Sequence, residues 1–372
     1  MSARVTTSTR DLADTRHRLE TWFAAHLPGA SAVRVSELTS PGATGMSSET
    51  LLFDVAWTDA AGAHTEALVA RIAPDPANVP VFPDYDFQAQ FDVMRLVGAH
   101  TDVPVPAVRH VELDPTALGA PFLVMERRYG VVPPDVMPYN FGTSWLFDAT
   151  REEQARLQSH TIAVLAELHA IERPESTFPF LVLDRPEPTA LGRHLGDWWA
   201  YYEWIVRDGL RSPLLERCRG WLEEHWPVDE GPTVFNWGDA RIGNVMYDGF
   251  TPVAVLDWEM ATLANREVEV AYLIYMHRNF EDAATGHGFA GMPHFLRADD
   301  VLTEYEKVSG HTPRDFEFYA MWNATRYGFI SAQCGRRAVH FGERAMPDDV
   351  DDLLMNRDAI ERMLAGTYWS SL

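Results

Sequence analysis

Residues 235–259, FNWGDARIGNVMYDGFTPVAVLDWE, constrain the fold more than any other stretch because they predict a tight β-hairpin between two polar loops. Residues 245–247 have the composition of a short strand, and Asp248-Gly249 is a strong signal for a two-residue hairpin turn. Residues 252–256, PVAVL, predict the returning strand. The side chains that flank the two strands should therefore meet at one end of the ribbon.

Three polar residues occupy those flanks. Asn244 precedes the first strand and Asp257 follows the second, while Asp239 lies just upstream, behind Gly238, which permits a tight backbone path. Phosphoryl transfer needs a carboxylate that orients or deprotonates the attacking hydroxyl, and hard oxygen ligands that hold magnesium on the phosphates. Asp239 suits the first role, and Asn244 and Asp257 suit the second. Taken singly, each is also a common turn residue.

Length and composition indicate a large, ordered protein. The chain has 372 residues, 46% of them hydrophobic, which is enough for one large core or two moderate ones, so two lobes are expected. Its two cysteines, Cys218 and Cys334, predict neither a disulfide framework nor a metal cluster, and they favour a reducing cytoplasm. No stretch approaches the roughly 20 apolar residues of a spanning helix, and no signal peptide is recognisable at the start, so no membrane association is expected.

The charge of the chain limits its partners. A formal net charge of −23 argues against a nucleic-acid partner, whose phosphates would be repelled. The charge is compatible with a cationic substrate, but surface solubility explains it equally simply. Lys307 is the only lysine, so almost all positive charge comes from arginine.

The first part of the chain predicts a β-rich lobe with few helices. Apolar residues at helical spacing predict a helix over residues 9–27, and residues 87–98 predict a second one. Alternating and β-branched segments predict strands over residues 33–38, 50–57, 66–72, 108–113 and 121–126.

The second part predicts a mainly helical lobe. Thr150 and Glu153 form a capping-box pattern that opens a helix through about residue 171. The aromatic side chains of residues 191–207 favour a packed core, although some could line a substrate pocket. The acidic run PDDVDD is expected to cap the terminal helix. Further helices are predicted over residues 267–276, 316–332 and 353–364.

The strings GDARIGNV and LDWEMATL together resemble the catalytic and metal-binding loops of the aminoglycoside phosphotransferase (APH) family, within the protein-kinase-like superfamily. The segments SSET, VPVPAV and LGAPFLVMER add to the resemblance, which is strongest with the branch related to the kinase-like domains of acyl-CoA dehydrogenase family proteins. The resemblance implies an α+β, two-lobed protein-kinase-like fold. Residues 1–127 would form the nucleotide-binding lobe with its leading helix, and residues 128–372 the helical lobe with the catalytic and metal-binding loops.

The resemblance also assigns roles to residues of the hairpin region. Asp239 matches the catalytic aspartate of the family, and Asn244 and Asp257 match its magnesium ligands. Arg241 resembles a residue common in this branch and would orient Asp239 or a phosphate, with orientation of the loop favoured. Trp237 replaces the histidine that often stands two residues before the aspartate, and a tryptophan could support the loop by packing and hydrogen bonding.

Two segments of the first lobe are candidate nucleotide-binding segments. The loop SPGATGMSSET would cover the phosphates through small residues and main-chain N–H groups, although such a loop is also an ordinary turn. The connection between the lobes would hydrogen-bond the adenine ring, although it could equally be a plain strand exit. The candidate residues are Gly42, Gly45, Ser47 and Ser48 in the loop, and Met125, Glu126, Arg127 and Arg128 in the connection.

Two positions depart from the family pattern. Arg71 stands where the phosphate-binding lysine is expected, and it keeps the charge but fixes a different geometry. Gln90 stands where a helix glutamate would pair with that lysine, and a neutral amide would lose the charge of the pair. If the register is shifted by one turn, Asp86 or Asp92 would make this pair instead.

The expected function is an ATP- and Mg²⁺-dependent phosphotransferase that moves the γ-phosphate to a hydroxyl of a small molecule. The acceptor would be aminoglycoside-like, with a link to antibiotic resistance, or a hydroxyacyl compound or small alcohol. The alternative is a nucleotide-binding pseudokinase that regulates a partner, because Arg71 and Gln90 depart from the pattern. The protein is expected to be a cytoplasmic monomer or homodimer.

Overall fold

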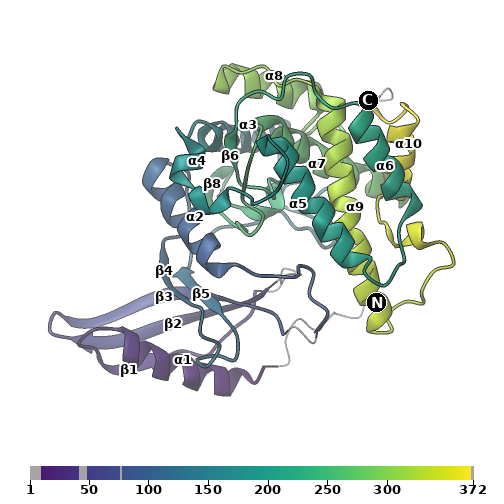
Figure 1. Cartoon of the computed structure of the whole chain (residues 1–372). Helices are drawn as coiled ribbons and strands as arrows, with labels where there is room; N and C mark the ends of the chain where they lie inside the picture. The colour runs from purple at the N-terminus through teal and green to yellow at the C-terminus, as the bar shows by residue number, and fades with distance from the viewer. Residues whose placement is uncertain (1–9, 42–47, 76–77, 370–372) are drawn as a thin grey trace. The chain divides into compact units, whose positions relative to one another are not determined.

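The structure is a computed structural model, and it describes residues 10–41, 48–75 and 78–369 (Figure 1). The contacts within the chain divide it into two compact units. The first unit contains the chain up to Gly98 together with Val105–Tyr129. The second contains Ala99–Pro104 and the chain from Gly130 onward, so a short stretch between α2 and β4 belongs to the helical unit.

The first unit is built on one antiparallel sheet, whose strands follow the order β1-β2-β3-β5-β4. Its two longest strands pair continuously from Glu49↔Ile72 to a tight turn at Asp59↔Gly62. The strands confirm the β-rich lobe predicted from the sequence. Their bounds are β1 Ser31–Val35, β2 Glu49–Asp59, β3 Gly62–Ile72, β4 Val108–Glu112 and β5 Phe122–Glu126.

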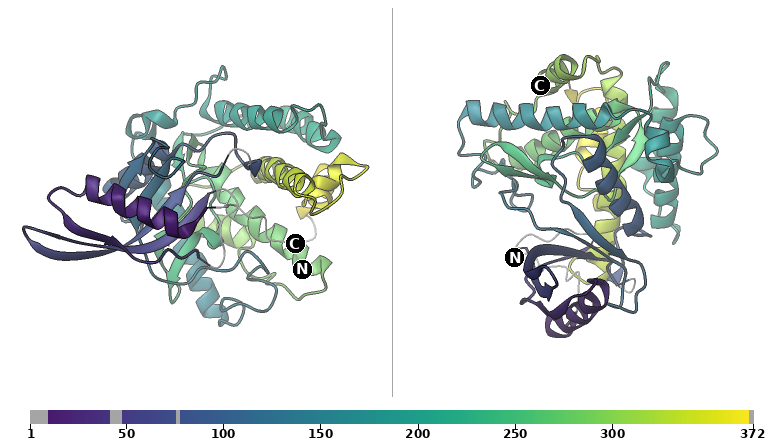
Figure 2. Two further views of the ribbon diagram at one scale, coloured as in Figure 1. Left: turned by 90° about the horizontal axis from the view of Figure 1, so that it is seen from below. Right: turned by 90° about the vertical axis from the view of Figure 1, so that its left-hand side faces the viewer.

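Helix α1, Leu12–His26, covers one face of this sheet, as Figure 2 shows in its left view. The helix begins where the Asp11 carboxylate accepts from the main-chain N–H groups of Ala13 and Asp14. Its buried residues Leu19, Trp22 and Phe23 join the apolar side chains of the strands in one core. The unit also contains all but the last two residues of α2, Phe87–His100, which is two residues longer than expected.

The second unit is mainly helical and carries two small sheets. Strand β6 pairs with β9, and β7 pairs with β8 in the expected hairpin. Helices α7 and α9 pack against each other. The strands are β6 Val234–Asn236, β7 Val245–Asp248, β8 Thr251–Val255 and β9 Thr262–Ala264. The helices are α3 Arg151–His169, α4 Pro174–Thr177, α5 Ala190–Ile205, α6 Pro213–Glu224, α7 Arg266–Gly286, α8 Ala298–Ser309, α9 Phe316–His340 and α10 Arg357–Leu364, with 3₁₀ turns η2 Pro179–Leu181, η3 Ile242–Asn244 and η4 Val350–Leu353.

Several helices of this unit differ from their sequence-based predictions. Helices α7 and α9 extend well beyond the predicted ends, and α6 and α8 were not predicted. The acidic run caps η4 rather than the terminal helix, because the Asp349 carboxylate accepts from the N–H of Asp351 and α10 begins only at Arg357. The capping box of α3 is present as predicted, with Thr150 and Glu153 exchanging hydrogen bonds.

The aromatic helix α5 contributes to the core, as its composition favoured. Tyr202 is fully buried and stacks on Phe329 of α9, with ring centroids 5.0 Å apart. Trp198, by contrast, is only partly buried and lies against the guanidinium of Arg326, 5.4 Å from its ring centroid.

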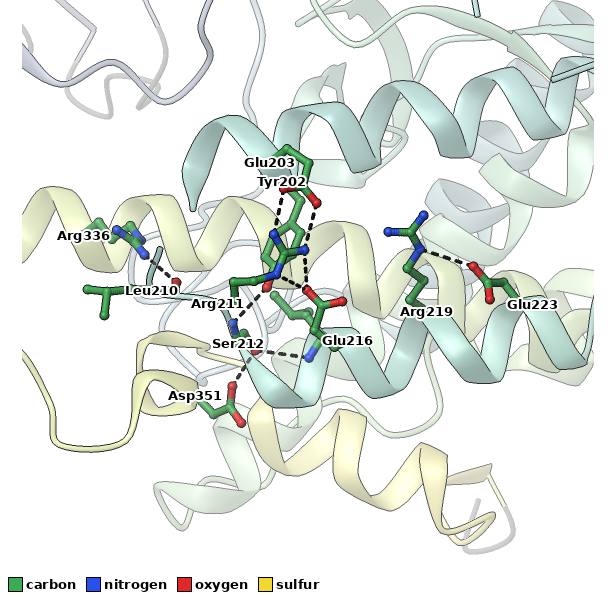
Figure 3. A network of polar contacts seen from close by, with 11 residues as sticks. Tyr202, Glu203, Leu210, Arg211, Ser212, Glu216, Arg219, Glu223, Arg336 and Asp351 are labelled. Carbon is green, nitrogen blue, oxygen red and sulfur yellow. Dashed lines mark hydrogen bonds and ion pairs between the residues drawn. The ribbon is translucent and has the colours of Figure 1, made fainter. Parts of the chain in front are cut away.

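The α5–α6 connection is held by a polar network (Figure 3). Arg211 forms ion pairs with Glu203 of α5 and Glu216 of α6, at 2.7 and 2.6 Å. The next residue, Ser212, caps α6 by accepting from the N–H of Leu215 and donates its hydroxyl to the buried Asp351. This network ties the start of α6 to α5 and to η4.

Two further findings concern the environment of the chain. Cys218 and Cys334 are both free, and burial raises the pKa of the Cys218 thiol to about 12, so Cys218 behaves as a packing residue.

In the part of the chain that the structure describes, the helices are all too short or too polar to cross a membrane.

Candidate active site

The β7–β8 hairpin places two of the predicted residues next to each other. Val245 pairs with Val255, and one step outward the main-chain N–H of Leu256 donates to the carbonyl of Asn244 at 2.8 Å. Asn244 and Asp257 therefore lie at the same end of the ribbon. Asp257 adopts a left-handed backbone conformation with φ 62°, which aspartate tolerates better than most residues.

Asp239 lies beside Asn244 and is held by three side chains. The Tyr272 hydroxyl donates to its Oδ1 at 2.7 Å, and Asn244 Nδ2 donates to its Oδ2 at 2.6 Å. Arg241 Nε contacts both oxygens, at 3.2 and 3.1 Å. Asn244 also donates to the main-chain carbonyl of Asp239, at 3.1 Å. The carboxylate is therefore fixed in one orientation.

These contacts keep Asp239 ionised although it is only 9% exposed. Burial raises the pKa of its carboxyl, but the charge of Arg241 and the hydrogen bonds from Tyr272, Arg241 and Asn244 act in the opposite direction. The net pKa lies below the ordinary value for aspartate. An ionised carboxylate can accept a hydrogen bond from a hydroxyl and align it for attack.

Gly238 anchors the loop that carries Asp239. Its N–H donates to Glu269 Oε1 at 2.6 Å, and its carbonyl accepts from Arg326 Nη2 at 3.0 Å. Its φ is 97°, and a Cβ at this position would collide with the main-chain carbonyl of Met260. Glu269 in turn accepts from His169 Nε2 at 2.9 Å. The main chain before Asp239 is thus held on both sides by buried charged side chains.

Trp237 supports the loop that carries Asp257. The residue is fully buried, and its indole N–H donates to the carbonyls of Leu256 and Asp257 at 2.8 and 3.1 Å. Packing and hydrogen bonding are the roles expected for a tryptophan at the position of the family's histidine. The side chain thus links the segment before Asp239 to the segment that carries Asp257.

Arg241 connects the site to a second carboxylate. Its Nη1 forms an ion pair with Asp135 Oδ2, in the segment that follows Gly130. Burial lowers the pKa of Arg241, but Asp239 and Asp135 raise it well above its ordinary value. Arg241 therefore remains charged between two carboxylates. Of its two predicted roles, orientation of Asp239 agrees with these contacts.

The oxygen atoms at the end of the hairpin can be compared with the ligands that a hard cation requires. The amide nitrogen of Asn244 donates to Asp239, so the side-chain oxygen of Asn244 is the atom that can bind a hard cation. Asp257 adds a carboxylate. The described residues contain no cluster of three or more His, Cys, Asp or Glu side chains that could hold a metal by themselves. A phosphate-bound Mg²⁺ needs only one or two protein ligands, so the residues present fit that ion.

In the first unit, the structure describes only some of the predicted phosphate-binding residues. Ser48 Oγ accepts from Arg71 Nε at 2.9 Å, so these two side chains are joined. Gln90 is buried on α2. Asp92, one of the two alternatives to Gln90, pairs instead with Arg95 on the same helix, at 3.0 Å. Gly42, Gly45 and Ser47 lie outside the described residues.

The predicted adenine-binding segment leaves few free main-chain groups. Glu126 N–H donates to the carbonyl of Ala107, and Arg127 N–H donates to that of Ala67, both at 2.9 Å. Arg127 also pairs with Asp54 on β2. Met125 pairs within the sheet, opposite Val69. A base could therefore use the N–H of Arg128, which donates to no main-chain carbonyl among the described residues, and carbonyls of the segment.

Sequence reasoning missed several residues that shape the site. Tyr272 and Arg326 come from α7 and α9, and Asp135 from the segment after the first unit. No local pattern marks them, although a lone arginine or tyrosine inside an apolar helix face is a weak signal of a buried polar contact. Glu269 of α7 belongs to the same group, because it accepts from the N–H of Gly238.

Comparison with known proteins identifies the family. Residues 54–305 match the model of the phosphotransferase enzyme family, abbreviated APH. The chain belongs to this family. Among curated relatives, it is 25% identical over 284 residues to probable acyl-CoA dehydrogenase IBR3 of Arabidopsis thaliana, covering 69% of this chain and 33% of that protein. It is 26% identical over 207 residues to acyl-CoA dehydrogenase family member 10 of Mus musculus, covering 55% and 18%. The chain thus spans a third or less of these relatives.

Solved structures of phosphotransferases share the fold. A Ralstonia eutropha protein assigned as an aminoglycoside phosphotransferase has a TM-score of 0.64 and 19% identity, over 95% of this chain and 98% of that one. Macrolide 2′-phosphotransferase MphH of Brachybacterium faecium has a TM-score of 0.54 and 13% identity, over 90% and 97%. A ternary complex of aminoglycoside phosphotransferase APH(4)-Ia with AMP-PNP and hygromycin B has a TM-score of 0.53 and 16% identity, over 94% and 99%. The α+β protein-kinase-like fold is confirmed.

Proposed function

We propose that the protein is an ATP- and Mg²⁺-dependent phosphotransferase that moves the γ-phosphate of ATP to a hydroxyl of a small molecule. The observation that carries the proposal is the fixed carboxylate of Asp239, which lies beside the Asn244 side chain at the end of the hairpin that also carries Asp257. Family membership supports the class of reaction. The predicted division into a nucleotide-binding lobe, residues 1–127, and a catalytic lobe, residues 128–372, is part of this proposal.

The proposed chemistry depends mainly on positioning. Asp239 accepts a hydrogen bond from the acceptor hydroxyl and aligns its oxygen with the γ-phosphorus, and its lowered pKa keeps the carboxylate ionised for this role. The transferred phosphoryl group leaves ADP, and the hydroxyl proton passes to Asp239. Asn244 and Asp257 would hold Mg²⁺, which when bound would neutralise charge on the phosphates. Arg71 with Ser48 would contact the phosphates from the first unit.

The acceptor is proposed as one of two chemical classes. Structural relatives that carry aminoglycoside or macrolide phosphotransferase names suggest a polyhydroxylated, antibiotic-like acceptor. The curated relatives are acyl-CoA dehydrogenase family proteins, which favours a hydroxyacyl compound or small alcohol. We favour the second class slightly, because the relatives detected by sequence come from that branch. The two free cysteines agree with a reducing compartment such as the cytoplasm.

The test measures ADP formation with ATP in the presence of hygromycin B, 3-hydroxybutyrate or 3-hydroxybutyryl-CoA, with Mg²⁺ or with EDTA. Asp239→Asn should lower kcat by about 10²–10⁴-fold, the usual range for losing a positioned general base. Asp257→Ala should abolish turnover. Asp184→Ala, which removes an exposed carboxylate outside the hairpin, is the control and should retain full activity. Unchanged activity of Asp257→Ala would refute the assignment.

A pseudokinase remains the second candidate, because Arg71 replaces the expected lysine and Gln90 replaces the expected glutamate. A pseudokinase would bind ATP without consuming it. Nucleotide binding measured by calorimetry, with no ADP formed with any of the three acceptors, would favour this alternative over the enzyme.

A further inference from the structure

Both oxygens of the Asp239 carboxylate are already occupied in this structure. Oδ1 accepts from the Tyr272 hydroxyl and from Arg241 Nε, and Oδ2 accepts from Asn244 Nδ2 and from the same Arg241 Nε. A carboxylate offers about four lone-pair positions, so these four contacts use all of them. An acceptor hydroxyl can reach Asp239 in good geometry only if one contact is released.

The two contacts with Arg241 Nε are the weakest of the four. A single N–H is shared between two oxygens at 3.2 and 3.1 Å, whereas Tyr272 and Asn244 approach to 2.7 and 2.6 Å. Tyr272 is fixed in the buried face of α7, and Asn244 is fixed by its second bond to the Asp239 carbonyl. Arg241 is a long and partly exposed side chain, with 21% of its surface accessible. Of the three side chains, Arg241 is therefore the one whose hydrogen bonds to Asp239 are broken most easily.

Asp135 provides the second place for the guanidinium. Its Oδ2 already pairs with Arg241 Nη1, while its Oδ1 is enclosed and has no hydrogen-bond partner among the described residues. Gly243 makes room for this carboxylate, because a Cβ there would collide with it. A cavity of about 10 Å³, roughly the space of one water molecule, also borders Arg241 and Gly243. Both the free acceptor atom and the adjoining space lie beside the guanidinium.

We propose that Asp135 is a positioning residue that draws Arg241 away from Asp239. In the acceptor-bound protein, the two terminal nitrogens of Arg241 pair with both oxygens of Asp135, and the vacated positions on Asp239 accept the substrate hydroxyl. Arginine and carboxylate form such two-pronged pairs readily. The arrangement with Arg241 on Asp239 is then the resting arrangement of the proposed cycle. The inference rests on the proposed role of Asp239 in phosphoryl transfer.

The rival explanation is that the Arg241–Asp135 pair only fastens the segment after Gly130 to the catalytic loop. In both roles the charge of Asp135 should matter only while Arg241 is present, because the pair needs both side chains. The two roles differ in where the guanidinium lies. If Asp135 acts by moving Arg241, the guanidinium should pair with both Asp135 oxygens once it leaves Asp239, whereas a pair that only fastens the segment leaves Arg241 on residue 239.

The kinetic test is a double-mutant cycle with Mg²⁺-ATP and the acceptors named above. Asp135→Asn should lower kcat roughly tenfold, because a charged partner is lost, and leave KM for ATP within about twofold. In the Arg241→Gln background the same substitution should have no further effect. Asp135→Glu should recover part of the activity, and Asp184→Asn, at an exposed carboxylate, is the control. Additive losses in the double variant would overturn the proposal.

A structural test does not depend on turnover. In a crystal structure of the full chain with Asp239→Asn, the charge that holds Arg241 is gone, and both terminal nitrogens should lie about 2.7–3.2 Å from the two Asp135 oxygens. Arg241 remaining on residue 239, or turning to solvent, would overturn the proposal. If no acceptor is phosphorylated but Arg241 moves as described, the proposed function fails and the coupling of Asp135 to Arg241 stands.

Discussion

Glu269 is the residue whose removal should most clearly separate support of the active-site loop from general stability. Its side chain is 1% exposed, and its two carboxylate oxygens accept from Gly238 N–H at 2.6 Å and His169 Nε2 at 2.9 Å. Glu269→Ala leaves both donors buried without a partner. Each such loss costs about 1–3 kcal/mol, so we expect a total of about 3 kcal/mol after partial relaxation. This is a large share of the roughly 5–15 kcal/mol that stabilises a typical domain.

The replacement Glu269→Gln should be milder for a specific reason. Its amide oxygen can still accept from Gly238, and its amide nitrogen can donate to His169 Nε2 if the ring carries its proton on Nδ1. That nitrogen lies 2.7 Å from the Tyr305 hydroxyl, which can accept in turn. The cost should therefore be about 1 kcal/mol, for the lost charge assistance.

Urea unfolding followed by tryptophan fluorescence measures these costs. With a slope of about 2–3 kcal/mol per molar urea, Glu269→Ala should move the midpoint down by about 1 M, and Glu269→Gln by a few tenths. Glu223→Ala, which removes an exposed carboxylate paired with Arg219 at 3.2 Å, is the control and should shift the midpoint by less than about 0.2 M. If the urea midpoint of Glu269→Ala equals that of the control variant, the hydrogen bond from Gly238 to Glu269 does not stabilise the protein as its contacts suggest.

Three further substitutions test single contacts of the same unit. Gly238→Ala places a Cβ against the Met260 carbonyl, so it should abolish ADP formation and lower the free energy of unfolding in urea by about 1–3 kcal/mol. A near-normal kcat would contradict this close approach. Trp237→Phe keeps an aromatic ring but removes two hydrogen bonds to main-chain carbonyls. We expect kcat to fall severalfold and about 1 kcal/mol of stability to be lost. An unchanged kcat would show that packing alone supports the loop. Ser212→Ala removes the cap of α6 and the side-chain donor to Asp351. Thermal unfolding should show about 1–2 kcal/mol of stability lost while kcat stays unchanged.

The hairpin could be predicted from sequence because its information is local. The Asp248-Gly249 turn fixes the register of two short strands, and that register alone places Asn244 and Asp257 at one end. Most elements of the first unit were predicted for the same reason, since strand alternation and the apolar periodicity of α1 span only a few residues. The family resemblance then supplied roles for residues that local structure had already brought together.

The supports of Asp239 could not be predicted, because they depend on how distant helices pack. Tyr272 is separated from Asp239 by 33 positions, and Asp135 from Arg241 by 106. Nothing in the sequence near Asp239 specifies which side chain of α7 or of the segment after Gly130 will reach it. The predicted helix ends were wrong for a related reason. Propensity alone does not show that α9 continues past residue 332, where a Cβ at Gly335 would lie only 3.1 Å from the Leu353 carbonyl.

The charges beneath the catalytic loop are better explained by positioning than by stability. Burying ionised groups is costly, and a pair of buried charges is often no more stable than apolar residues of similar size. Glu269 and Arg326 nevertheless bind the N–H and the carbonyl of Gly238, one residue before the proposed catalytic carboxylate. Because they hold main-chain atoms, they fix where Asp239 begins without using any of its side-chain oxygens. In the proposed mechanism, the loop would thus keep one position while Arg241 and an acceptor hydroxyl compete for the carboxylate.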